Sequence, residues 1–174
     1  MSLFSRLLGK PDDSRAALRP LWHRVIELAR APDLYARLGV ADTQPGRFDM
    51  LTMVLALVML RMEREESLIA PSALLSELFV DDMDGQLRQS GVGDLVVGKR
   101  MGKLMGALGG RLGALREALA ADVDGDAALV EVVRRNVTLT DAGDAAAIAA
   151  RLRAIAAAVD SASAEELLAG RIAA

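Results

Sequence analysis

The chain has 174 residues and a net charge of −3, and 52% of its residues are hydrophobic while only 3% are aromatic. This length fits one domain with a substantial core, and the acidic balance gives no overall attraction to nucleic acid, so no DNA partner is expected. The absence of cysteine excludes disulfides, thiolate catalysis and cysteine-bound zinc. Good helix formers dominate, which predicts an all-α, single-domain bundle of about six to eight helices.

The first eleven residues are predicted to form an N-terminal arm (1–11) ahead of the helical domain (12–174). Residues 2–10 (SLFSRLLGK) place apolar side chains on one side and two basic side chains on the other. Two alternatives follow: peripheral contact with a membrane surface, or a terminus that frays or packs on the bundle. The segment lacks the long apolar region and cleavage site of a secretory signal. The expected location is therefore the cytoplasm. In the first alternative, the arm would add peripheral contact with the inner membrane face.

Periodic patterns predict short helices before the central one. A first helix is expected from about Ser14 to about Arg30, and Pro20 is expected to split or restart it, because proline is tolerated mainly in a first helical turn. A short helix over 32–38 is expected to end at Gly39 with a left-handed cap. Residues 40–46 are predicted to be a loop.

Residues 48–62 (FDMLTMVLALVMLRM) are the most apolar stretch, interrupted only by Asp49, Thr52 and Arg61. Apolar side chains cover every face of the predicted helix, so the helix must be buried. The run is shorter than the roughly 20 residues that a membrane span needs, and several charged residues follow it. We predict that it is the central helix of a soluble bundle.

Further helices are predicted after the central one. Pro71 is expected to open the next helix, and Ser163 with Glu166 matches a capping box that begins the last. The predicted ranges, from apolar spacing, are about 71–90, 95–121, 127–136, 141–159 and a short helix after 163.

Two kinds of motif suggest a nucleotide site and a calcium site, but neither has the residues that such a site requires. Residues 93–100 (GDLVVGKR) match a phosphate-binding P-loop up to Lys99, but Arg100 stands where Ser or Thr is needed, and an amphipathic helix precedes the motif instead of a strand. Nucleotide binding is therefore a minor alternative. The acidic runs near 81–84 and 122–126 lack the spacing of a calcium loop. No cofactor, metal or catalytic residue is predicted.

Glycine recurs at every fourth position of the predicted helix 95–121, at Gly102, Gly106 and Gly110. This stripe falls opposite the leucine stripe of the same helix and is flanked by Lys99 and Lys103. Each mid-helix glycine costs about 1 kcal/mol relative to alanine. A face without side chains lets another helix approach closely, as in membrane helix pairs. The approaching helix belongs either to a partner or to this same chain.

The order of several short motifs resembles the ubiquinol–cytochrome c chaperone family, which occurs in mitochondria and in bacteria related to their ancestor. The resemblance covers about residues 15–140 and points to a bacterial member. The motifs are Ala31–Pro32 with Tyr35, Leu38–Gly39–Val40, Asp42–Thr43, Gly46–Arg47–Phe48–Asp49, Asp82–Met83–Asp84, Gly91–Val92–Gly93–Asp94–Leu95 and Gly98–Lys99–Arg100–Met101.

The resemblance implies a non-catalytic assembly factor for the quinol-oxidising respiratory complex. Its expected client is cytochrome b or another helical membrane protein, and its further partners are a small helical protein or the ribosome. A helical adaptor for a different membrane-protein client is the alternative function. The residues expected to contact a partner are Asp94, Lys99, Arg100 and Lys103, then Arg47 and Asp49, with Gly102, Gly106 and Gly110 forming the groove.

Overall fold

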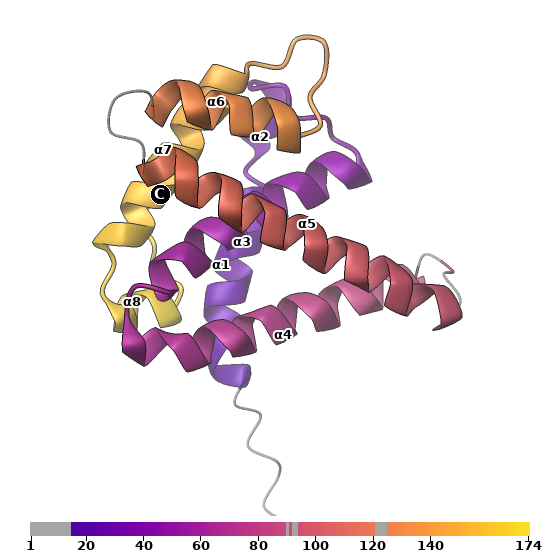
Figure 1. The fold of residues 1–174 in the computed structure, drawn as a ribbon, viewed down its shortest axis with the longest axis vertical. Coiled ribbons are helices and arrows are strands. Elements are labelled where there is room, and N and C mark those ends of the chain that lie inside the picture. Colours follow the sequence, from indigo (N-terminus) through magenta and orange to yellow (C-terminus); the bar gives the residue numbers. More distant parts are fainter. Residues whose placement is uncertain (1–14, 90, 92–93, 121–124) are drawn as a thin grey trace, which may run out of the picture.

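In the computed structural model the described residues are 15–89, 91, 94–120 and 125–174, and they form a helical bundle (Figure 1). Among these residues there is no β-strand, only an isolated bridge between Val40 and Leu139. The predicted all-α fold is confirmed, whereas the N-terminal arm lies outside the described residues. The elements in order are the 3-10 helix η2 (Ala16–Leu18), α1 (Arg19–Ala29), α2 (Pro32–Ala36), α3 (Gln44–Met62), α4 (Glu66–Gln89), α5 (Asp94–Ala120), α6 (Gly125–Asn136), α7 (Ala145–Ser161) and α8 (Ala164–Leu168).

Helix α3 is the buried centre of the bundle, as its all-round apolar sequence predicts. Every residue from Met50 to Val58 is buried, and α3 packs against α1, α4, α5 and α7. The helix begins at Gln44, earlier than predicted, because Thr43 caps it: the Thr43 hydroxyl accepts a hydrogen bond from the Gly46 N–H at 3.3 Å. Pro45 occupies the first turn, where its missing N–H costs nothing.

Several predicted helix ends are confirmed. Pro20 lies in the first turn of α1, and Gly39 and Gly91 adopt positive φ angles of 78° and 80° after α2 and α4. The capping box of α8 is present, with the Ser163 N–H donating to the Glu166 carboxylate at 3.0 Å and the Ser163 hydroxyl accepting from the Glu166 N–H at 3.3 Å.

Two predicted starts are wrong. Helix α4 begins at Glu66, so Pro71 lies in its second turn, where its missing N–H removes one backbone hydrogen bond without ending the helix. Helix α7 begins at Ala145 and not at Asp141, because the Asp144 carboxylate is the cap and accepts from the Ala147 N–H at 2.9 Å.

The segment before α7 joins the segment before α3, so residues about a hundred positions apart lie side by side. The Thr140 N–H donates to the Gly39 carbonyl at 2.9 Å, and the Ala41 N–H donates to the Thr138 carbonyl at 2.9 Å. The approach at Gly39 is close enough that a Cβ there would lie 2.5 Å from the Gly143 Cα. Both the space and the left-handed backbone at position 39 therefore require glycine.

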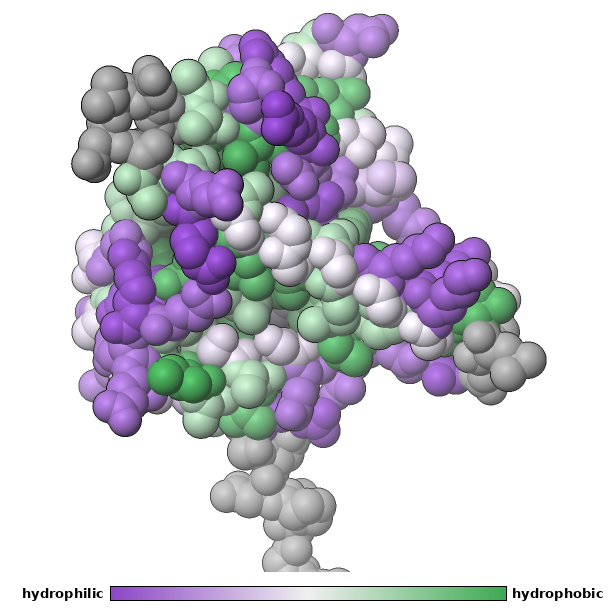
Figure 2. Space-filling view, viewed as in Figure 1, coloured by the Kyte–Doolittle hydropathy of each residue, from purple (hydrophilic) through white to green (hydrophobic). Residues whose placement is uncertain are grey.

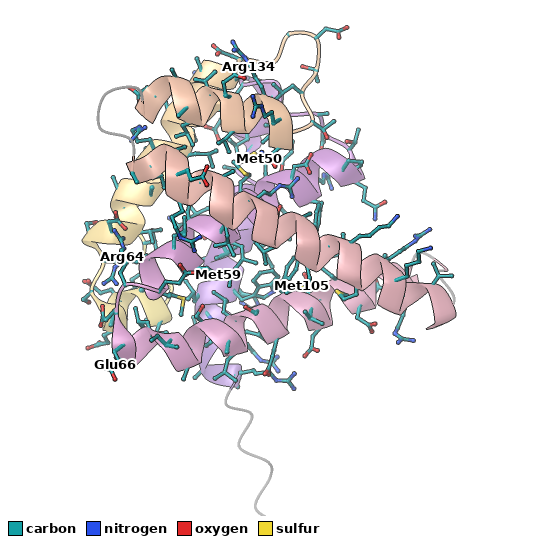
Figure 3. All side chains as sticks on the ribbon, in the orientation of Figure 1. Met50, Met59, Arg64, Glu66, Met105 and Arg134 are labelled. Atoms are coloured by element: carbon teal, nitrogen blue, oxygen red, sulfur yellow. The ribbon has the colours of Figure 1, made fainter. Side chains whose placement is uncertain are left out.

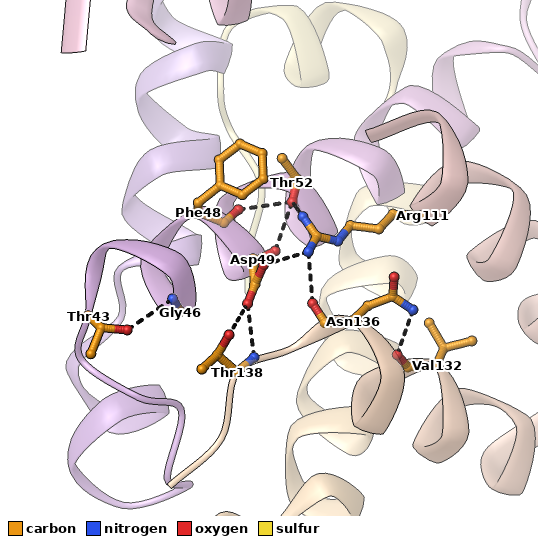
Figure 4. A network of polar contacts seen from close by, with 9 residues as sticks. All are labelled: Thr43, Gly46, Phe48, Asp49, Thr52, Arg111, Val132, Asn136 and Thr138. Carbon is orange, nitrogen blue, oxygen red and sulfur yellow. Dashed lines mark hydrogen bonds and ion pairs between the residues drawn. The ribbon is translucent and has the colours of Figure 1, made fainter. Parts of the chain in front are cut away.

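A buried ion pair connects α5 to α3 (Figure 4). Arg111 of α5 is only 7% exposed, and its Nη2 atom lies 2.5 Å from Asp49 Oδ1 and donates to the Asn136 carbonyl at 2.9 Å. Its Nη1 atom donates to the Thr52 hydroxyl, and its guanidinium carbon lies 5.4 Å from the centroid of the Phe48 ring. A buried charge is tolerated only when it is paired and hydrogen-bonded, so this arginine has one well-defined position.

The other carboxylate oxygen of Asp49 binds the segment that follows α6. It accepts hydrogen bonds from the Thr138 N–H at 2.9 Å and from the Thr138 hydroxyl at 2.6 Å (Figure 4). One buried carboxylate therefore holds three parts of the chain together: α3, α5 and the connection between α6 and α7.

We expect Gly39→Ala to lower the free energy of unfolding by at least about 1–2 kcal/mol, because alanine is strained at positive φ and its methyl group would collide with Gly143. Chemical denaturation measures the effect. Gly85→Ala is the matched control: a Cβ there meets nothing within 4 Å inside α4, and we expect stabilisation of up to about 1 kcal/mol. Equal effects of the two substitutions would contradict the close contact at Gly39.

We expect Arg111→Met to lower the free energy of unfolding by about 3–5 kcal/mol, because it leaves the Asp49 carboxylate buried without its counter-ion. Arg134→Met, which removes an exposed ion pair with Glu131, should cost less than about 1 kcal/mol. Adding Asp49→Leu to Arg111→Met should recover part of the loss, since no unpaired charge then remains. If Arg111→Met cost no more than Arg134→Met, the ion pair would not hold α5 in place.

Candidate partner-binding surface

The N-terminal half of α5 carries the basic residues that the sequence singles out. It extends from the body of the molecule together with the C-terminal half of α4 (Figure 1). Lys99, Arg100 and Lys103 are exposed, and none of them makes a hydrogen bond or ion pair with the residues that the structure describes. Asp94 is the first residue of α5, and its side chain lies outside the described part. Three unpaired cations within two helical turns make this end of α5 locally positive.

The glycine face of α5 is open. A Cβ placed on Gly102, Gly106 or Gly110 would meet no atom within 4 Å beyond its own helix, and the same is true of Gly98, Gly109 and Gly113. The opposite face of α5 is buried through Val97, Leu108 and Leu115, as the leucine stripe predicts. None of the described segments of this chain packs on the glycines, so within 15–89, 94–120 and 125–174 the same-chain alternative is not observed. Binding of a partner helix there stays a prediction.

The surface view shows the two parts of this face (Figure 2). Pale atoms of intermediate hydropathy follow α5 diagonally across the molecule, and hydrophilic atoms gather over its N-terminal part. Val96, which is 45% exposed, lies in the same turns as the cations. We call the glycines from Gly98 to Gly113, with Lys99, Arg100, Lys103 and Val96, the α5 outer face.

The structure separates Arg47 and Asp49 from the α5 outer face. Asp49 is 8% exposed and its carboxylate is occupied by the ion pair, so it does not present a charge at the surface. Arg47 is exposed at the mouth of a cavity of about 610 Å³ between α3, α4 and α5. Leu104 lines this cavity from the side of α5 that faces away from the glycines.

The mouth of that cavity holds an exposed ion pair. Arg47 Nε lies 2.6 Å from Asp42 Oδ1, and this hydrogen bond holds the pKa of the Asp42 carboxyl below its ordinary value. Arg30 lies at the same mouth, and Phe48 and Leu51 line the apolar interior. The cavity is distinct from the α5 outer face.

The P-loop alternative lacks its structural context. Residues 94–100 form the first turns of α5, and the element before them is the helix α4. A P-loop instead connects a buried strand to a helix. Within the described residues, no cluster of three or more His, Cys, Asp or Glu side chains is arranged to hold a metal ion.

None of the described helices combines the length and the apolar character that crossing a membrane would need.

Comparisons with known proteins agree with the resemblance drawn from the sequence motifs. Residues 36–174 match the family described as Ubiquinol-cytochrome C chaperone. The fold is similar to the crystal structure of the Cbp3 homolog from Brucella abortus, with a TM-score of 0.78, 30% identity, and coverage of 98% of this chain and 95% of that chain. No curated protein matches the sequence. The family match covers most of the chain, and the structural match covers nearly all of both proteins. This chain therefore belongs to the ubiquinol–cytochrome c chaperone family.

Proposed function

We propose that this protein assists assembly of the ubiquinol–cytochrome c reductase complex by holding cytochrome b, through one of its membrane helices, on the α5 outer face. The observation that carries the proposal is that the glycines of this face meet no other described part of the chain, and that three unpaired cations lie at one end. Family membership supplies the assembly role. The physical properties of the face support this position for the client.

The glycines suit close contact with another helix. Each one weakens the isolated helix by about 1 kcal/mol relative to alanine, and here no neighbouring segment of the described chain makes use of the space. Helices that pack in membranes approach each other through small residues, which let two backbones come close over several turns. A newly made membrane helix held outside lipid would bury its own apolar surface against such a face.

The cations at the N-terminal end of α5 favour one orientation of the bound helix. The C-terminal end of a helix carries partial negative charge on its unpaired carbonyl groups, and acidic residues often flank apolar segments. Lys99, Arg100 and Lys103 can meet either group without first breaking an ion pair of their own. Exposed charges of this kind raise the rate of association and make it sensitive to salt. A small helical partner protein and the ribosome are further contacts proposed for the same protein.

A photo-crosslinking residue at Lys103, in cells that make cytochrome b, tests the client and its position together. We expect an adduct with cytochrome b, because Lys103 borders the glycine stripe. The same residue placed at Arg134, an exposed side chain on α6, is the control and should give no such adduct. Adducts from position 103 with a different membrane protein alone would replace cytochrome b by another client and favour the adaptor function.

Gly106→Leu tests whether the bare backbone is used. We expect the amount of client captured to fall by about tenfold or more, because the leucine side chain fills the surface that the partner helix must approach. Stability should be unchanged or raised by up to about 1 kcal/mol, since the site is open and leucine favours the helix. Co-purification with the client and a denaturation curve measure the two effects.

Ala150→Leu, an exposed alanine in the middle of α7, is the matched control for Gly106→Leu and should leave capture unchanged. If Gly106→Leu captures as much client as this control does, the client binds to another surface.

A further inference from the structure

Another cavity lies at the opposite end of α5, where the C-terminal parts of α3 and α5 meet α7. Its volume is about 470 Å³. Leucine and alanine side chains form its apolar lining, among them Leu57, Leu60 and Leu119. It does not include any residue of the α5 outer face, so whatever it binds is independent of the proposed client surface.

Four arginines line this cavity, Arg61, Arg64, Arg116 and Arg153, together with the two carboxylates of Glu63 and Asp160. They come from three different helices or their ends, so only the folded chain brings them together. Figure 3 shows Arg64 beside the end of α3, whereas Arg134 lies on α6 at the top of the view. Each of the four is ion-paired, to Glu65, Asp160, Glu63 and Asp126 respectively.

These ion pairs leave most of the arginine donors available. Asp126 is 90% exposed, and the side chains of the other three acidic partners are 36–50% exposed, so water competes for every pair. A guanidinium group has five N–H donors, of which a single contact uses one. The arginines can therefore turn toward an anion in the cavity at little cost.

Arg153 has two donors without an aligned acceptor. Its Nε and Nη2 atoms are shielded from solvent, and neither has a hydrogen-bond acceptor among the described residues. Nε lies 2.6 Å from Asp126 Oδ1 and is paired with this carboxylate without being aligned to donate to it. A buried donor without an aligned acceptor costs about 1–3 kcal/mol, and Asp126 is exposed enough to be displaced. Nε and Nη2 form one edge of the guanidinium, and an anion that displaces Asp126 from this edge can offer it two oxygens side by side.

We propose that this cavity binds the phosphate headgroup of an anionic phospholipid. The several oxygens of one phosphate can accept from more than one of the four arginines at once. The cavity is much larger than a phosphate group, and its apolar lining suits the first part of an acyl chain. Ile69, which is 58% exposed in the first turn of α4, follows Arg64 after a short turn and offers a further apolar contact to a bilayer at this end.

The overall charge makes such binding site-specific. With a net charge of −3, the chain has no general attraction to an anionic membrane. Binding must then depend on the local arginines, and removing one of them should have a large effect. An exposed arginine elsewhere should matter little.

Calorimetry with a short-chain phosphatidylglycerol below its micelle concentration tests the proposal on the full chain. We expect Arg153→Gln to weaken binding by about tenfold or more, because it removes the two donors that lack an acceptor. Arg116→Gln, an exposed side chain of the same cavity, is the second variant and should also weaken binding. Arg134→Gln is the matched control and should bind as the unmodified protein does, and Gly106→Leu should do the same. Thermal unfolding curves confirm that each variant is folded.

Three comparisons decide the outcome. Flotation with vesicles should require phosphatidylglycerol, and equal flotation with phosphatidylcholine alone would overturn the proposal. Unchanged binding by both Arg153→Gln and Arg116→Gln would remove the cavity as the site. Inorganic phosphate that binds as tightly as the short-chain lipid would show a site for small phosphates and contradict the assignment to a lipid.

Discussion

The ion pair between Asp49 and Arg111 is the contact on which the arrangement of this bundle depends. An ionised carboxylate inside an apolar helix is unfavourable until partners surround it, and here the partners come from α5 and from the segment after α6. The pair therefore selects one packing of α5 on α3 among the many that leucine contacts alone would permit. Because α5 is held by its buried side, its glycine side is turned to solvent.

The two ends of α5 differ in what they present. The N-terminal part shows bare backbone and unpaired cations, which suits a helix of another protein. The C-terminal part closes an apolar cavity surrounded by arginines whose partners are exposed carboxylates. Together the two proposals connect, along one helix, a surface for a membrane-protein client with a site for the membrane's own lipid. Such a protein would hold its client close to the bilayer that the client must enter.

Local signals account for what could be predicted from the sequence. The all-round apolar pattern of 48–62 identifies the central helix, and capping chemistry at Ser163 and Gly39 marks two helix ends correctly. The predicted starts of α4 and α7 are wrong because a proline in a first turn and one further inside a helix look alike in sequence, and because Asp141 and Asp144 both suit a helix start.

Long-range pairing explains what could not be predicted. Asp49 resembles a surface charge in a short motif, and only the position of Arg111, an arginine within a leucine stripe, hinted that the two would meet inside. The arginine cavity has no signal at all in the sequence, since its residues are spread over about a hundred positions on three helices.

The contact between Gly39 and Gly143 also determines the order in which the chain can fold. These residues are about a hundred positions apart, so the segment before α3 cannot adopt its final position until nearly the whole chain has left the ribosome. Until then the most apolar helix of the protein lacks several of the neighbours that cover it. The chain therefore passes, during its own synthesis, through a period in which its central helix is as exposed as the membrane helix of the proposed client.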